Sequence, residues 1–392
     1  VFSPNTDLPS SVYKSDCLIS LNIYRCNLSL QNITSTKAHF SRLKSLRLYA
    51  VKFADEHVFN MIMRSCPYIT TMLFKECEGL KTVTWVRHKY LKHFTFINHR
   101  THDRNECNIR IHFPTLLRTI DIVGSRILFL GGHKFDNLKI LSLDWIEFSR
   151  FSFDCSSSYE FPLLETLTFK CCHGWTRFDQ ILNITAPKLV RFLYVGRSVP
   201  SLTFATPMSR QCRSEISLRC RGDDPQTWFV KLSGLLHALG QSEILLRVYQ
   251  LDPYDIHNIN EPYIDNIIIE HVEVELLELT IGNLPSFPRV LNRLFTICRP
   301  RKIGHVRGGE SQNELTEFLC NFLMKSSDTE FSSWKEDLEE VTIESFDADT
   351  KQWEHVALLP ESEKSIRFQL KWSEDANCEE EESSSKRRRM FE

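Results

Sequence analysis

Cysteine and histidine are the residue types in this chain whose spacing could bind a metal or supply a nucleophile. The two densest groups are Cys171–Cys172–His173 and the pair His99 and His102. Neither group has a second half at the spacing of a zinc site, and no C-x-x-C occurs. We therefore expect no metal site, and we assign these residues structural or solvent-exposed roles.

Motifs of other kinds of catalysis are missing as well. The sequence contains no P-loop, G-x-G-x-x-G, H-E-x-x-H or G-x-S-x-G. The glycine pairs Gly131–Gly132 and Gly308–Gly309 lack the flanking residues of a phosphate loop and indicate turns. We expect a protein that is not an enzyme, with no catalytic residues and no cofactor.

The net charge and the cysteines indicate which classes of binding partner and which cellular compartment to expect. A net charge of -2 gives no global attraction to nucleic acid or to an anionic membrane, and no run of about 18 apolar residues predicts a membrane span. Thirteen cysteines, an odd number, and a start at Val1 without a leader predict reduced thiols in the nucleus and/or cytoplasm. The sequons at Asn27, Asn32 and Asn183 favour secretion instead, but such tripeptides also arise by chance.

A repeated spacing of apolar residues predicts the elements that position any binding residues. The stretch Leu43–Leu80 contains this spacing twice, as L-x-x-L-x-L-x-x-V-x-F and then I-x-x-M-x-F-x-x-C. Between the two copies, Asp55–Ser65 predicts a helix that Asp55 caps. The apolar face of this helix is formed by Val58, Phe59, Ile62 and Met63. A strand, a turn and a returning helix in about 25 residues are typical of the leucine-rich repeat (LRR).

Eight in-phase copies of the spacing occur before residue 200. They begin at Leu18, Leu43, Ile69, Leu91, Leu117, Leu138, Leu164 and Leu189. Their spacing lies in the range of roughly 20–29 residues that this repeat class shows. Cys26, Cys77 and Cys172 occupy the turn position that favours Asn or Cys. The sequence predicts an α/β leucine-rich-repeat solenoid (a horseshoe) with a parallel concave sheet, short convex helices and irregular C-terminal repeats.

Residues between the buried positions of each strand should point outward on the concave face. Tyr24, Arg47, Tyr49 and Lys75 are predicted to form one patch over three repeats, and aromatic and arginine side chains suit protein-binding hot spots. The candidate partner-binding residues are Tyr24, Arg47, Tyr49, Lys75, Asp121, Asp144 and Lys170. A weaker ninth copy, at Ile216 and Leu218, would place Ser217 and Arg219 on the same face. For any single residue, a mixed solvated surface is the alternative.

The repeated spacing of apolar residues becomes irregular after Ser201. We therefore divide the chain into residues 1–224 (regular repeats), 225–372 (irregular C-terminal repeats or a cap) and 373–392 (a disordered acidic-then-basic tail). Helices are expected at Trp228–Leu239 and Asn313–Lys325. Strands are expected at Ile244–Val248, Leu276–Ile281 and Ser365–Trp372, with a late copy of the repeat at Leu338, Val341, Ile343 and Phe346. In the tail, Lys386, Arg387, Arg388 and Arg389 form a possible nuclear-import run, although basic runs this short are more often only solvated charge.

Several short sequence segments of the chain resemble those of the plant F-box/LRR proteins. Ser65-Cys66-Pro67, Cys77 and Gly79-Leu80 stand where repeats of that family carry these residues, and WKEDLEEVTIESF resembles the C-terminal module of F-box/LRR/FBD proteins. The resemblance implies a substrate receptor of an SCF-type ubiquitin ligase, whose repeats bind a protein substrate on the concave face.

In that family an F-box binds the Skp-type adaptor of the cullin complex, and Val1–Cys17 carries no such pattern. We therefore expect the adaptor and the cullin to be partners only through an F-box missing from this chain. Two other readings stay open: a receptor-like or immune-type LRR interaction module outside ubiquitination, and a degenerate copy without function.

Overall fold

The computed structural model describes residues 6–29, 40–84, 88–99, 107–112, 116–130, 134–148, 158–173, 181–219, 225–249, 271–280, 287–305, 312–324, 333–347, 349–357 and 365–373. The chain forms two compact units, Val1–Ile244 and Leu245–Glu392, which we call unit 1 and unit 2. The sequence-based boundary between residues 224 and 225 concerns repeat regularity and stays a prediction. By its contacts, the helix that follows this boundary belongs to unit 1.

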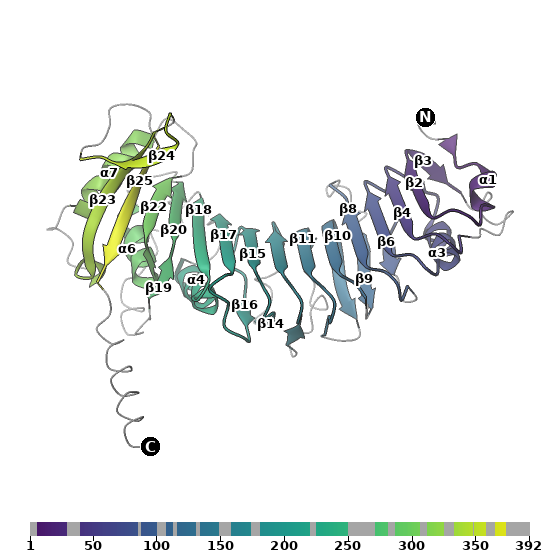
Figure 1. Ribbon diagram of the computed structural model, residues 1–392, viewed down its shortest axis with the longest axis horizontal. Coiled ribbons are helices and arrows are strands. Elements are labelled where there is room, and N and C mark those ends of the chain that lie inside the picture. The colour runs from purple at the N-terminus through teal and green to yellow at the C-terminus, as the bar shows by residue number, and fades with distance from the viewer. Residues whose placement is uncertain are drawn as a thin grey trace, which may run out of the picture. The chain divides into compact units, whose positions relative to one another are not determined.

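The main sheet of unit 1 is a row of parallel strands that lie side by side (Figure 1). In order along the sheet they are β2 (Ser20–Tyr24), β4 (Ser45–Tyr49), β6 (Thr71–Lys75), β8 (His93–Ile97), β10 (Thr119–Leu130), β11 (Ile140–Glu147), β13 (Thr166–Lys170), β15 (Arg191–Gly196) and β17 (Arg213–Arg219). Each pair aligns equivalent repeat positions, so that Leu46 lies between Leu21 and Met72. The eight predicted copies and their register are confirmed.

Side chains of these strands alternate between the interior and the outward face, as the period of two requires. Leu141 and Leu143 of β11 are almost fully buried, and the side chain of Ser142 between them is half-buried on the other face. Their register partners Leu167 and Phe169 are buried in the next repeat. The core is therefore a stack of apolar layers, and each repeat depends on its neighbours for burial.

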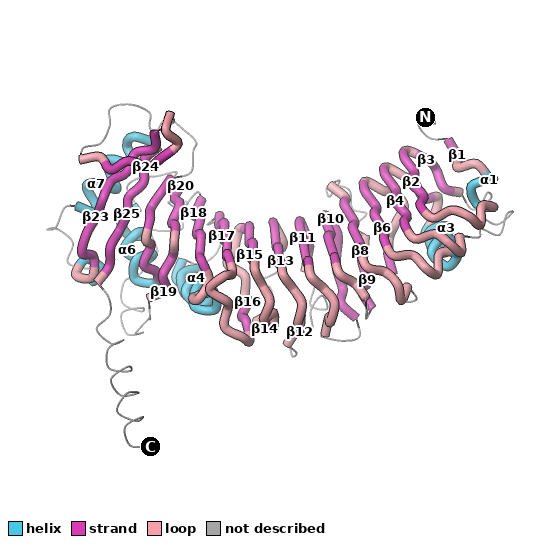
Figure 2. Tube along the Cα trace, viewed as in Figure 1, coloured by secondary structure: helices cyan, strands magenta, loops and turns pink. Residues whose placement is uncertain are grey.

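The return segments of the repeats form mainly short parallel strands (Figure 2). These are β1 (Thr6–Asp7), β3 (Cys26–Leu28), β5 (Lys52–Phe53), β7 (Thr82–Thr84), β9 (Asn108–His112), β12 (Tyr159–Glu160), β14 (Leu182–Thr185) and β16 (Leu202–Phe204). Helices described in unit 1 are α1 (Ser10–Tyr13), α3 (Glu56–Ser65) and α4 (Pro225–Leu239). The predicted helix after Asp55 is confirmed as α3, since the Asp55 carboxylate accepts a hydrogen bond of 3.0 Å from the Val58 N–H.

In most repeats a left-handed residue lies two positions after the second buried residue of the main strand, and the side chain that follows it points inward. Positive φ angles occur there at Arg25, Ala50, Glu76, Gly124, Trp145 and Cys171. The next residue is a cysteine in three of these repeats, at Cys26, Cys77 and Cys172. The Cys77 and Cys172 thiols lie 3.6 Å and 3.4 Å from the Leu48 and Leu143 carbonyls of the preceding repeat. Burial raises the pKa of both thiols to about 12, so they stay neutral. Cys26, Cys77 and Cys172, which the repeat template assigns to the turn position, are all buried there.

The ninth copy has a different register from the one expected. The strand places Ser214 opposite Phe192 and Ile216 opposite Tyr194, so the inward pair is Ser214 and Ile216 rather than Ile216 and Leu218. The residues of this strand in register with the two outward positions of the preceding repeat are then Glu215 and Ser217. Arg219 follows two residues later in the same strand and is exposed, and Leu218 between Ser217 and Arg219 is buried, so the expected face of Arg219 is not contradicted. A serine is tolerated at this buried position because its hydroxyl bonds the Ser242 hydroxyl at 2.7 Å, which in turn donates to the Leu239 carbonyl.

Unit 2 continues with parallel strands and then changes to antiparallel pairing. Leu245–Tyr249 of β18 (Glu243–Tyr249), β20 (Leu276–Thr280) and β22 (Lys302–His305) are parallel, whereas β23 (Leu338–Asp347), β24 (Gln352–His355) and β25 (Ile366–Trp372) pair antiparallel. The remaining elements are β19 (Val272–Val274), α6 (Phe287–Ile297), β21 (Cys298–Pro300), α7 (Gln312–Met324) and η4 (Ser333–Lys335). The strand expected at Leu338–Phe346 exists, but it is not a late copy of the repeat, because its partners run antiparallel.

Aromatic rings hold the centre of unit 2 together. Trp334 packs edge-on against Phe295 with ring centroids 4.7 Å apart, and Trp372 lies 5.9 Å from the same phenyl ring. The Trp334 indole N–H donates to the Asn292 side-chain oxygen at 3.0 Å, which satisfies its polar group in the interior. The tryptophan that opens the phrase WKEDLEEVTIESF is therefore a core residue.

A substitution within one strand should separate the inward from the outward face. We expect Leu143→Ala to lower the free energy of unfolding by about 2–5 kcal/mol, because it leaves a cavity between two repeats. Ser142→Ala, one residue away on the outward face, should change it by less than about 0.5 kcal/mol. Urea denaturation followed by circular dichroism measures both, and equal effects would contradict the alternation described for β11.

A second stability prediction concerns Gly79, where two repeats approach closely. Its φ is +82°, and a Cβ built there would lie 2.2 Å from the Phe53 carbonyl oxygen. We expect Gly79→Ala to destabilise the fold by about 1–3 kcal/mol or more. Gly234→Ala is the matched control, because nothing lies within 4 Å of a Cβ there and alanine favours the helix α4 by about 0.4–1 kcal/mol. Thermal denaturation of the two variants should shift in opposite directions.

Candidate functional site

The outward face of unit 1 carries two parallel rows of side chains that run across the strands. The first row consists of Asn22, Arg47, Leu73, Thr95, Asp121, Ser142, Thr168, Leu193 and Glu215. The second row consists of Tyr24, Tyr49, Lys75, Ile97, Val123, Asp144, Lys170, Val195 and Ser217. Neighbours in a row are register partners, so they lie one strand spacing apart, roughly 4.8 Å in the backbone.

The N-terminal end of the two rows is aromatic and basic. The rings of Tyr24 and Tyr49 stack with centroids 4.4 Å apart and planes inclined by 1°, and Tyr24 remains 59% exposed. Lys75 follows Tyr49 in the same row, and Arg47 stands in the adjacent row; both are exposed. The structure thus places the four residues of the predicted patch together, which we call the tyrosine patch.

The other three candidate residues form a second group, which we call the aspartate group. Asp144 and Lys170 are register partners in the second row, and Asp121 lies in the first row one strand before Asp144. Strand β8, with Thr95 and Ile97, separates the aspartate group from the tyrosine patch. The seven predicted residues therefore share one face but form two clusters of different chemistry.

Asp144 has the most perturbed electrostatics of these residues. Burial raises the pKa of its carboxyl above the usual range, and the charges of Lys170 and His99 and a hydrogen bond from the Trp145 backbone oppose this shift only partly. Its Oδ1 atom is buried without a hydrogen-bond partner among the residues that the structure describes. A half-buried carboxylate with an unused acceptor atom is a position that a donor or cation of a partner would stabilise.

Trp145 is an exposed aromatic residue directly after Asp144 that the repeat template does not predict. It is 45% exposed, has φ 52° within β11, and contacts the His173 ring edge-on with ring centroids 5.8 Å apart. The template assigns its position to a turn, so an outward role was not expected there. A tryptophan at a position held by Arg25 or Ala50 in other repeats is the signal that could have found it.

The cysteine and histidine groups of the sequence are separated by the fold. Cys172 is buried in its turn, while His173 is exposed against Trp145. His102 and the run Lys386–Arg389 lie outside the described residues. Over the described part of the chain no group of three metal-ligating side chains occurs. No helix in the described ranges is long and apolar enough to cross a bilayer.

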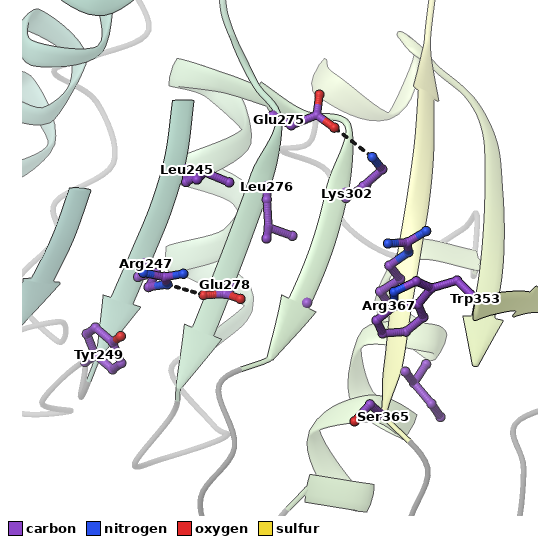
Figure 3. Close-up of a pocket in the computed structure, with 12 residues that line it drawn as sticks. Leu245, Arg247, Tyr249, Glu275, Leu276, Glu278, Lys302, Trp353, Ser365 and Arg367 are labelled. Atoms are coloured by element: carbon purple, nitrogen blue, oxygen red, sulfur yellow. Dashed lines mark hydrogen bonds and ion pairs between the residues drawn. The ribbon is translucent and has the colours of Figure 1, made fainter. Parts of the chain in front are cut away.

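Unit 2 contains a hollow of about 720 Å³ on its sheet (Figure 3). It is lined by Leu245, Arg247, Tyr249, Glu275, Leu276, Glu278, Lys302, Gly304, Trp353, Ser365, Ile366 and Arg367. Arg247 pairs with Glu278, and Lys302 pairs with Glu275 at 2.7 Å. This hollow could not be predicted from the sequence, because its walls come from strands outside the repeat template and from the hairpin that carries Trp353.

Comparison with known proteins supports the family resemblance over part of the chain. Residues 1–120 match the family model for the leucine-rich repeats of the FBD-associated F-box protein At5g56370. A comparison with curated proteins gave no match. The predicted similarity to F-box/LRR/FBD repeats is confirmed for these 120 residues.

The raised pKa of Asp144 gives a pH-dependent prediction. A carboxyl whose pKa is higher in the folded state stabilises the fold below its ordinary pKa, and this contribution is lost as the pH rises through the raised value. At pH 7 the buried carboxylate therefore costs stability, and we expect Asp144→Asn to raise the urea midpoint there.

The gain from Asp144→Asn should shrink as the pH falls toward the range where the wild-type carboxyl binds its proton. Asp136→Asn, at an exposed aspartate of unit 1, is the control and should show little change. If Asp144→Asn instead destabilises the protein at pH 7, the attraction of Lys170 outweighs burial and the interpretation is wrong.

Proposed function

We propose that this chain is the substrate-recognition part of an F-box protein that serves an SCF-type ubiquitin ligase. In this proposal the outward face of unit 1 binds a protein substrate. The match of residues 1–120 to the repeats of an FBD-associated F-box protein supports the family assignment. The stacked pair Tyr24 and Tyr49 beside Arg47 is the observation that supports a protein partner.

The side chains of the tyrosine patch are already partly ordered, so binding a partner would cost them little conformational freedom. Tyrosine and arginine are enriched at the points of an interface that carry most of the binding free energy. The two rings already lie parallel at 4.4 Å, so less side-chain freedom is lost on association than for two separate tyrosines. A backbone fixed on both strands by the parallel register adds rigidity.

The aspartate group gives the same face a second, complementary contact. Asp144 offers a half-buried carboxylate with an unused oxygen, and Trp145 offers an exposed ring next to it. We propose that a substrate segment crossing the strands contacts aromatic and basic groups at one end and donates to Asp144 at the other. Such separated contacts would select a partner by both shape and charge.

Recognition of this kind requires no catalytic residue in the chain. The Skp-type adaptor and the cullin would join through an F-box, and ubiquitin transfer would occur on other subunits. We place the protein in the nucleus and/or cytoplasm, where Lys386–Arg389 would act as an import run.

Affinity capture with mass spectrometry tests the proposal. The full-length transcript product and this 392-residue chain are each tagged and purified with their partners. We expect the Skp-type adaptor and the cullin only with a product that carries an F-box, and the same further protein with both. That shared protein is the candidate substrate.

Tyr49→Ala and Arg47→Glu should each weaken binding of the shared protein about tenfold or more, since truncating a hot-spot residue costs about 2 kcal/mol or more and about 1.4 kcal/mol corresponds to tenfold in affinity. Tyr68→Ala is the matched control, because Tyr68 is also an exposed tyrosine in a ring pair but lies outside the two rows. Recovery that depends equally on Tyr68 would reject the tyrosine patch. If no ligase subunit accompanies any product, an LRR interaction module outside ubiquitination or a copy without function is left.

A further inference from the structure

The hollow of unit 2 is lined in part by Gly304, a glycine of the strand β22. Gly304 is the register partner of Glu278, and β22 pairs antiparallel with β25 through Ile303 and Phe368. Continuing this register places Gly304 beside Arg367, which also lines the hollow. The row of side chains across this sheet therefore has a gap between a carboxylate and a guanidinium.

The fold itself does not require a glycine at this position. Gly304 lacks the left-handed φ of Gly79, and a Cβ built on it would meet Leu276 Cδ1 at 3.6 Å and Glu278 Cγ at 3.8 Å, which are ordinary contacts. A glycine in a strand interior weakens the strand and often marks a place where another molecule approaches closely. The glycine keeps a space open that a larger residue would fill.

Part of the wall of this space is apolar or aromatic. Leu245 and Leu276 lie next to each other on adjacent strands, while Tyr249 and Trp353 stand on opposite sides of the hollow (Figure 3). Such a surface favours a group that prefers to leave water.

The charges around the space are already neutralised. Arg247 is paired with Glu278, Lys302 with Glu275, and Arg367 with Glu344. A charged ligand would have to replace one of these pairs, and it would lose its own hydration in doing so. The charge pattern therefore favours a neutral ligand.

Arg367 supplies a flat, fixed surface for such a ligand. Its guanidinium carbon lies 4.3 Å from the Trp353 ring centroid, and its Nε bonds the Glu344 carboxylate. Stacking on one side and an ion pair at the edge hold the guanidinium in one orientation. A second ring could stack on the same group, and its terminal N–H groups could donate to a main-chain carbonyl.

We propose that the hollow over Gly304 binds a neutral aromatic side chain of an extended segment from a partner protein. A volume of about 720 Å³ lies in the range of ligand sites and exceeds a single side chain, so it leaves room for flanking main chain. The occupant being a protein rests on the proposed function, but the residues belong to unit 2 and are independent of the tyrosine patch.

Capped tripeptides test this site on the purified 392-residue chain. The probes are Ac-Ala-Trp-Ala-NH₂ and Ac-Ala-Phe-Ala-NH₂, with Ala, Lys or Glu at the centre as comparisons, and binding is followed by ligand-observed NMR titration. We expect the aromatic probes to bind about tenfold more tightly than the alanine probe, and the charged probes no better than alanine. Absence of an aromatic preference overturns the proposal.

Gly304→Val is the decisive variant, because it fills the space and valine favours strands. We expect it to weaken the aromatic probes about tenfold or more while the thermal midpoint is unchanged or higher. Gly234→Ala is the glycine control and should leave probe binding unchanged. Unweakened binding to Gly304→Val overturns the site; if both Gly304→Val and the smaller Gly304→Ala fail to fold, the fold needs this glycine and the proposal also falls.

Two further variants separate this site from the proposed function. Arg367→Lys keeps the charge but removes the flat surface, and we expect several-fold weaker aromatic binding. Tyr49→Ala should leave probe binding unchanged, because the tyrosine patch lies in unit 1. If Tyr49→Ala abolished tripeptide binding, the probes would bind at the tyrosine patch and not in the hollow, and the proposal would be wrong. If the affinity capture recovered no partner, the proposed function would fail while the tripeptide result would still stand.

Discussion

The parallel hydrogen-bond register between consecutive repeats is the constraint on which unit 1 depends. The N–H of Thr70 donates to the Lys44 carbonyl, and that of Lys92 donates in turn to the Thr70 carbonyl. Because side chains alternate along a strand, a shift of one residue in any pairing would turn that repeat's leucines outward. Register therefore sets both the apolar layers and the two outward rows. Because the outward rows cross many strands, an error of register at any one pair of strands would misplace the outward side chains of that repeat.

Most of unit 1 could be predicted because its rule is local and repeated. Equivalent residues such as Leu46, Met72 and Phe94 differ in chemistry but keep their spacing, and the register pairs them directly. The prediction failed at Ser214, where a hydroxyl occupies a core position because Ser242, distant in the sequence, satisfies it. Apolar spacing cannot reveal such a pair. The cap of α3 by Asp55 was predictable because capping involves neighbours in the chain.

The candidate sites were predictable to a smaller extent. The repeat pattern identified Tyr24 and Tyr49 as outward residues, but their stacking depends on rotamers that the sequence does not encode visibly. Trp145 was missed because its left-handed turn position was treated as a connection. The hollow of unit 2 could not be found, since β22 and β25 meet antiparallel across a long stretch of chain. The ion pairs around the hollow and the glycine at Gly304 indicate a binding site only when the pairing of β22 with β25 is known.

The buried thiols of the turns make the chain its own reporter of local motion. A thiol held neutral by burial reacts with alkylating reagents only when its surroundings open. Cys77 and Cys172 sit in different repeats of unit 1, and Cys298 is buried in unit 2. Their relative rates of alkylation would rank the opening free energies of three parts of the protein without the introduction of any new cysteine. Because each repeat is stabilised by the repeats beside it, that ranking shows which region of the stack unfolds first.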